Sequence, residues 1–198
     1  NIAGILMISV IYALAKNIFK NRKWAILAGL LMMFDCFHFA QTRMGTVDSF
    51  LVLFIMLSAL FMYKYIVLEN DAKLKTKLVN LFLSGLFIGC AIATKWTGFY
   101  AGLALAIVFF ANIIYRNVGK GKEKDKDLGK IILSCFVFFV GIPLLIYVLS
   151  YLLFPIVYPG KVEGISGLMK QTQDMYTYHS TLEGTDPFTS EWYTWPAM

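Results

Sequence analysis

The residues best suited to chemistry in this sequence are two isolated cations, Arg43 and Lys95, each next to a long apolar run. Arg43 is always charged, and its planar guanidinium can fork onto a phosphate or a carboxylate. Asp48, five residues later, either pairs with Arg43 or caps the helix that follows it. Lys95 precedes Trp96, and such a pair serves equally well as an anchor at a membrane interface. Together the two cations predict a site for an anionic headgroup or phosphate.

Other polar side chains stand in the same stretches. Asp35 and His38 are three residues apart, which places them on one helical face. A carboxylate at membrane depth is costly and by default indicates function, although a hydrogen bond to a neighbouring helix is an alternative. We take five residues to line the site: Asp35, His38, Gln41, Asp48 and Trp96.

The last forty residues are rich in aromatic side chains. Apolar residues between Ile165 and His179 recur at helical spacing, which predicts an amphipathic helix lying on the membrane surface. Aromatic rings near a polar mouth suit the stacking of a sugar, and anchoring in the membrane interface is the alternative. The residues expected to contact sugar or acceptor are Tyr178, His179, Trp192, Tyr193 and Trp195.

The amino-acid composition indicates whether water or lipid surrounds the protein. Of the 198 residues, 59% are hydrophobic and only 15% are charged, whereas soluble domains carry about 25% charge. Intrinsic disorder and an ordinary water-soluble enzyme are therefore excluded, and lipid must cover much of the surface. The three cysteines lie in apolar runs without metal-ligand spacing, so no metal site is expected. Residue 1 is Asn within an apolar run, and we expect the sequence to be an internal piece of a longer protein.

Six apolar segments approach the ~20 residues needed to cross a bilayer. They are residues 1–15, 24–40, 49–68, 78–94, 97–115 and 131–158. Because backbone groups in hydrocarbon must bond within their own segment, all six are predicted to be helices. The expected fold is an all-α, polytopic transmembrane bundle spanning residues 1–157, followed by an extracytoplasmic helix and aromatic tail at 158–198.

The basic residues are distributed unevenly. Fourteen of the 18 lie in or beside loops near residues 16–23, 69–77 and 116–130, which share one side if the helices alternate. The positive-inside rule makes that side cytoplasmic. It also accounts for the net charge of +6 without nucleic acid as a partner. The run at 120–130, in which lysines and acids alternate, is expected to be a flexible loop, and Arg43 and Lys95 are expected on the extracytoplasmic face.

Three motifs resemble those of the protein O-mannosyltransferase family. The run LLMMFDCFHFAQTRMGTVDSFLVLF resembles the family's apolar-Asp, Gln-Ser/Thr-Arg and later Asp pattern, and GCAIATKWTGFYAG resembles its Lys-Trp-Ser/Thr-Gly-x-Tyr stretch. The tail MYTYHSTLEGTDPFTSEWYTWP resembles its Tyr-His and Trp-x-x-Trp-Pro pattern, with Asp-Pro-Phe where the family often has His-Pro-Tyr. The motifs occur in the family's order over most of the chain.

This resemblance implies a GT-C-type, inverting glycosyltransferase embedded in a membrane, the cell membrane if the source is bacterial. Its donor would be polyprenyl-phosphate mannose, and its acceptors would be Ser or Thr hydroxyls of secreted or membrane proteins. Arg43 and Lys95 would bind the donor phosphate, with no cofactor and no metal. The family's acidic pair, which supplies the general base, would precede Asn1, so this piece is expected to be inactive alone.

Three other functions remain open on sequence grounds. A transferase that moves lipid-linked sugar to lipid A or another glycan is the nearest alternative, and the tail motif favours the protein mannosyltransferase. A transporter would need polar residues along a path through the helices, whereas here they cluster at one face. A purely structural scaffold would explain the hydropathy and not the clustered charges. The oligomeric state, monomer or dimer, also stays open.

Overall fold

The computed structural model of the chain describes residues 1–117, 125–157 and 164–181, in which all regular secondary structure is helical. In chain order the elements are α1 (Ile2–Phe19), α2 (Arg22–Met33), α3 (Cys36–Arg43), α4 (Asp48–Ile66), α5 (Leu74–Thr94), α6 (Gly98–Asn117), α7 (Leu128–Phe136), the π-helical turn η1 (Val137–Gly141), α8 (Ile142–Val157) and α9 (Gly164–Ser180). Among them, five helical segments are long and apolar enough to cross a membrane, or six if the bent α2–α3 pair forms one span. The predicted all-helical, multi-pass fold is confirmed.

α2 and α3 occupy the stretch predicted as one continuous helix, and they are bent by 57° at the break between them. Asp35 is the N-cap of α3, and its carboxylate accepts hydrogen bonds from the backbone N–H of Phe37 at 3.0 Å and of His38 at 3.3 Å. The prediction that Asp35 and His38 share one helical face is therefore wrong. An Asp side chain that bonds the backbone just ahead of it competes with helical hydrogen bonding, and it starts a new helix.

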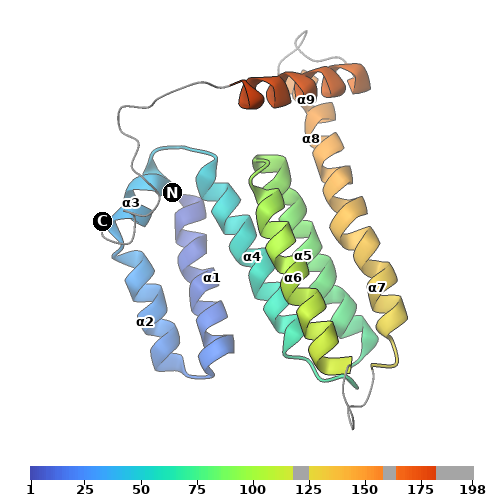
Figure 1. Cartoon of the computed structure of the whole chain (residues 1–198). Coiled ribbons are helices and arrows are strands. Elements are labelled where there is room, and N and C mark those ends of the chain that lie inside the picture. Colours follow the sequence, from blue (N-terminus) through green and yellow to red (C-terminus); the bar gives the residue numbers. More distant parts are fainter. Residues whose placement is uncertain (118–124, 158–163, 182–198) are drawn as a thin grey trace. The chain divides into compact units, whose positions relative to one another are not determined.

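The spans of residues 1–150, which form one compact unit, alternate in direction (Figure 1). The α1–α2 and α4–α5 connections and the facing ends of α6 and α7 lie at one end, here called the basic end. Two long-range contacts support this placement: the Tyr63 hydroxyl donates to the Asn17 carbonyl at 3.4 Å, and Lys77 Nζ lies 2.7 Å from Asp125 Oδ2. The opposite end, here called the α3 end, holds α3, the start of α4 and the α5–α6 turn.

α4 and α5 are joined by a buried serine pair. The Ser58 hydroxyl contacts the Ser84 carbonyl at 2.8 Å and its hydroxyl at 3.0 Å, and the Ser84 hydroxyl reaches the Ser58 carbonyl at 3.0 Å. Both side chains are fully buried. Small hydroxyl residues allow membrane helices to approach closely and keep each polar group satisfied.

α5 packs against the last span through two glycines. A Cβ at Gly85 would collide with the backbone carbonyl of Phe138, and one at Gly89 would lie 2.9 Å from Pro143 Cα. Pro143 is the second residue of α8 and has no N–H to offer the preceding turn, and the π turn η1 ends at Gly141, two residues before it. The glycines therefore fix how closely α5 and this irregular span meet.

Apolar side chains cover the outside of the bundle as well as its interior. Ile107 and Leu133, for example, are each 70% exposed, which suits a protein whose solvent is lipid. Residues 151–198 form a second compact unit. Within it, α9 supplies the helix that the sequence predicts, and the Tyr151 hydroxyl donates to Met175 Sδ at 3.4 Å. The location of α9 on a membrane surface stays a prediction.

Candidate functional site at the α3 end

Arg43 is the last residue of α3 and is exposed. Its guanidinium carbon lies 4.7 Å from the centre of the Phe39 ring, one turn earlier on the same helix. None of the ion pairs among the described residues involves Arg43. The guanidinium lies over the face of the Phe39 ring, a contact that leaves its N–H groups without a carboxylate partner in the described part of the chain. This arrangement leaves a cation that is oriented and open to an anion.

Asp48 pairs with Lys95. The distance from Lys95 Nζ to Asp48 Oδ1 is 2.8 Å, and both side chains are 47% exposed. Asp48 opens α4 and Lys95 is the C-cap of α5, so the pair joins two neighbouring helix ends. The two expected roles of Asp48 are thus corrected: it does not pair with Arg43, and the N-cap of α4 is Val47.

Arg43 and Asp48 lie on either side of the turn between α3 and α4, and they have different partners: Arg43 contacts Phe39, and Asp48 contacts Lys95. Gly45 adopts a positive φ of 69°, which a side chain would disfavour. The Ser49 hydroxyl donates to the Gln41 carbonyl at 3.4 Å and closes the turn. The Thr46 hydroxyl is buried, with no hydrogen-bond partner among the described residues. Sequence reasoning missed Thr46, since a threonine beside a glycine reads as an ordinary turn residue.

Trp96 is fixed by a residue from a distant part of the chain. Its indole Nε1–H donates to the Tyr147 hydroxyl of α8 at 3.3 Å, and the side chain is half-buried. This hydrogen bond fixes the polar edge of the ring that follows Lys95 in the sequence. Tyr147 was missed by sequence reasoning, because nothing in an apolar run indicates the partner of a single phenol.

The remaining predicted residues lie in three places. His38 and Gln41 are half-buried on α3, close in sequence to Arg43, and Asp35 is exposed at the start of that helix. Tyr178 and His179 are both exposed on α9, with ring centres 5.3 Å apart. Trp192, Tyr193 and Trp195 fall outside the described residues. At the α3 end, Asp48 and Lys95 are in contact, whereas Arg43 contacts Phe39 of its own helix and Trp96 contacts Tyr147; the aromatic pair belongs to the second unit.

Metal ligands do not gather in the described part of the chain: it contains no group of three or more His, Cys, Asp or Glu side chains able to hold an ion. The chemistry available at the α3 end is the binding of an anion by Arg43 and, after exchange with Asp48, by Lys95.

Residues 1–154 match the family described as dolichyl-phosphate-mannose-protein mannosyltransferase. The chain belongs to this family. It is 21% identical to the polyprenol-phosphate-mannose–protein mannosyltransferase of Mycolicibacterium smegmatis, over 98% of this chain and 45% of that protein. It is 25% identical to the protein of the same name from Corynebacterium glutamicum, over 76% of this chain and 32% of that protein. The chain thus spans less than half the length of these relatives. No solved structure matches it.

Proposed function

We propose that this chain forms the membrane part of an enzyme that transfers mannose from polyprenyl-phosphate mannose to Ser or Thr hydroxyls of exported proteins. Family membership and the names of the two relatives support this reaction. The structural observation that carries it is the unpaired, ring-backed guanidinium of Arg43 at the α3 end. A lipid-linked sugar phosphate requires such a cation at the boundary between an apolar bundle and water.

Arg43 would bind the phosphate and stabilise it as it leaves. When the bond between the anomeric carbon and the phosphate oxygen breaks, negative charge accumulates on the phosphate. A cation already in position stabilises this charge without reorganising at the moment of reaction. The Phe39 ring restricts the guanidinium before the donor arrives.

Lys95 would supply a second contact by exchanging partners. Its half-exposed pair with Asp48 belongs to a class that contributes only about 0–1 kcal/mol. A phosphate group beside Arg43 can therefore displace Asp48 from the ammonium at small cost.

In the proposed step, the hydroxyl oxygen of the acceptor attacks the anomeric carbon from the side opposite the phosphate. The new C–O bond forms as the old one breaks, so the configuration inverts and polyprenyl phosphate leaves. A base must take the hydroxyl proton. Asp35 caps α3 and Asp48 pairs with Lys95, so we assign the base to neither and expect it outside this chain.

The α3 end would face the extracytoplasmic side, because the positive-inside rule holds the basic end in the cytoplasm. Single-cysteine labelling of the full-length protein tests this orientation. A membrane-impermeant reagent should label Thr97→Cys in intact cells and Asp71→Cys only after permeabilisation; both positions are exposed. Labelling of Asp71→Cys from outside would reverse the orientation.

The reaction itself is tested with the full-length enzyme in proteoliposomes, supplied with polyprenyl-phosphate mannose and a Ser/Thr-containing acceptor peptide. Mannosyl peptide should form, and a peptide with Ala at every Ser and Thr should stay unmodified. Transfer to a lipid A-type glycolipid instead of the peptide would overturn the proposal and favour the alternative glycan transferase.

A further inference from the structure

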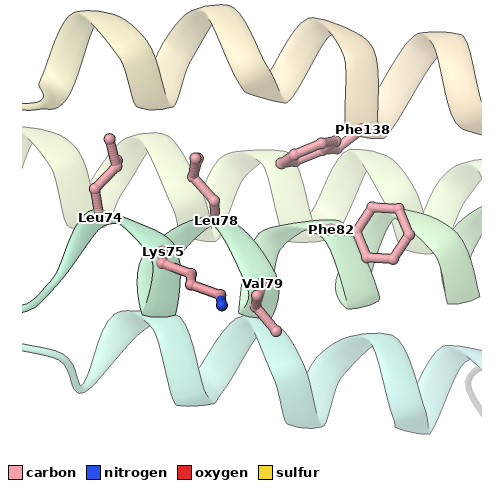
Figure 2. A pocket seen from close by; sticks show the side chains of 6 residues that line it. All are labelled: Leu74, Lys75, Leu78, Val79, Phe82 and Phe138. Atoms are coloured by element: carbon pink, nitrogen blue, oxygen red, sulfur yellow. The ribbon is translucent and has the colours of Figure 1, made fainter.

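A groove of about 380 Å³ runs along the first half of α5, at the basic end and away from the α3 end. Its volume lies at the low end of the ~300–1,000 Å³ typical of ligand pockets. The six lining residues are Leu74, Lys75, Leu78, Val79, Phe82 and Phe138 (Figure 2). Five are apolar, and Lys75, in the first turn of α5, is the single cation among them.

Two aromatic rings line one end of the groove. The rings of Phe82 in α5 and Phe138 in the π turn make an edge-to-face contact, with a centroid distance of 5.7 Å and an interplanar angle of 80°. Seven residues separate Lys75 from Phe82, so the groove extends roughly 10 Å along the helix axis. Val79 and Phe82 are 45% and 38% exposed, so the groove faces the surroundings of the bundle.

Lys75 and Lys77 differ in what surrounds them. Lys77 is buried, paired with Asp125 at 2.7 Å and bonded to the Asn70 carbonyl at 2.6 Å. Lys75 is exposed and takes part in none of the ion pairs of the described residues. The ammonium of Lys75, which lies next to Val79 (Figure 2), is therefore available to an external anion.

We propose that this groove binds one anionic phospholipid, with its phosphate at Lys75 and an acyl chain lying along Val79 and Phe82 to the Phe138 ring. An acyl chain suits walls that offer no hydrogen-bonding group, whereas a peptide backbone would leave its polar groups unsatisfied there. The lone cation selects the headgroup: a phosphate without its own positive charge pairs with Lys75, whereas a choline headgroup already carries one. Basic pockets beside transmembrane helices recognise anionic lipids in this way.

The test uses native mass spectrometry of the full-length protein, delipidated and then exposed to equal amounts of phosphatidylglycerol and phosphatidylcholine with identical acyl chains. The wild type should retain phosphatidylglycerol about fivefold over phosphatidylcholine, the preference expected of one lysine near an anionic headgroup. Lys75→Gln should abolish this preference. Val79→Trp, which fills the groove, should reduce retention of both lipids.

Lys23→Gln is the matched control, because Lys23 is also an exposed cation at the basic end but does not line the groove. It should keep the wild-type preference. Equal preference in the wild type and Lys75→Gln would overturn the proposal, and so would an equal loss in Lys75→Gln and Lys23→Gln, which would indicate attraction by overall charge. An unchanged unfolding temperature of Lys75→Gln confirms that the comparison is made on folded protein.

Discussion

The ammonium of Lys95 lies 2.8 Å from the carboxylate of Asp48, so the end of α5 is tied to the start of α4. Each charge also suits its own helix end, because a carboxylate is favoured in a first turn and a cation beyond a last turn. With both side chains half-exposed, the contact positions Lys95 but holds it weakly. Arg43, in contrast, lies against the Phe39 ring and takes part in none of the ion pairs of the described residues. The two cations thus differ: Arg43 has no ion-pair partner among the described residues, and Lys95 is paired weakly with Asp48.

This inequality predicts that Asp48→Asn strengthens donor binding. In the wild type, Lys95 must break an ion pair that contributes about 0–1 kcal/mol before it can bind the donor phosphate. The variant has no such pair to break, so the KM for polyprenyl-phosphate mannose should fall by up to about fivefold. Lys95→Ala should raise the KM instead. Steady-state transfer by the full-length enzyme at varied donor concentration measures both. If Asp48→Asn impaired transfer as much as Lys95→Ala, the intact pair and not the freed ammonium would be what the site requires.

Arg43 should be the more sensitive of the two cations. Loss of one charge-assisted contact costs about 1.5–3 kcal/mol, which corresponds to a roughly ten- to hundredfold loss of turnover in Arg43→Ala. Arg43→Lys should restore only part of the rate, because an ammonium cannot reproduce a forked contact. Lys23→Ala at the basic end serves as the charge-matched control, at equal protein level. Near-normal transfer by Arg43→Ala would remove Arg43 from the site.

The hydropathy and the placement of charges in the sequence were sufficient to predict much of the fold. Five of the six apolar segments correspond to one observed span each within a few residues, the second is divided between α2 and α3, and the α1–α2 and α4–α5 connections lie at one end (Figure 1). The break at Asp35 was not predicted, because the surrounding apolar run continues through it. Only the N-cap geometry shows that this carboxylate serves the backbone of α3.

Partners distant in the sequence were the other features that pattern reasoning could not supply. The motifs selected Asp48 and Lys95 separately, and the packing of α4 on α5 brings them together. Likewise, the run of alternating lysines and acids reads as a solvated loop, yet Asp125 within it is buried against Lys77. Composition reports the average environment of a segment, whereas the pairing of one residue depends on where the neighbouring helix ends.

Lys77 and Asp125 should be coupled in stability. Removing one partner of a buried ion pair leaves an uncompensated charge and costs about 3–5 kcal/mol, whereas replacing both by apolar residues is often nearly neutral. Lys77→Met should therefore lower the unfolding temperature clearly, and Lys77→Met with Asp125→Leu should recover much of the loss. Thermal unfolding of the full-length protein in detergent measures the effect.

The exposed pair of Lys130 and Asp127, at 3.3 Å on α7 and its N-cap, provides the control for this experiment. Lys130→Met should change the unfolding temperature little, since exposed pairs contribute about 0–1 kcal/mol. An additive loss in the double variant, equal to the sum of the two single losses, would show that Lys77 and Asp125 act independently.

Substitutions in the aromatic tail can distinguish a role in binding sugar or acceptor from a role in anchoring the protein in the membrane. Tyr178 and His179 project from α9 into the surroundings, and Trp192 and Trp195 follow in the sequence. If these rings bind sugar or acceptor, Trp192→Phe, Trp195→Phe and His179→Ala should leave protein abundance normal and lower transfer per folded enzyme. Anchoring alone predicts the reverse, with reduced abundance in the membrane and normal specific activity, since aromatic side chains stabilise proteins at the lipid interface. Measuring transfer at saturating and at limiting donor then shows whether the loss concerns the donor or the acceptor, because only a weakened donor site is restored at saturation.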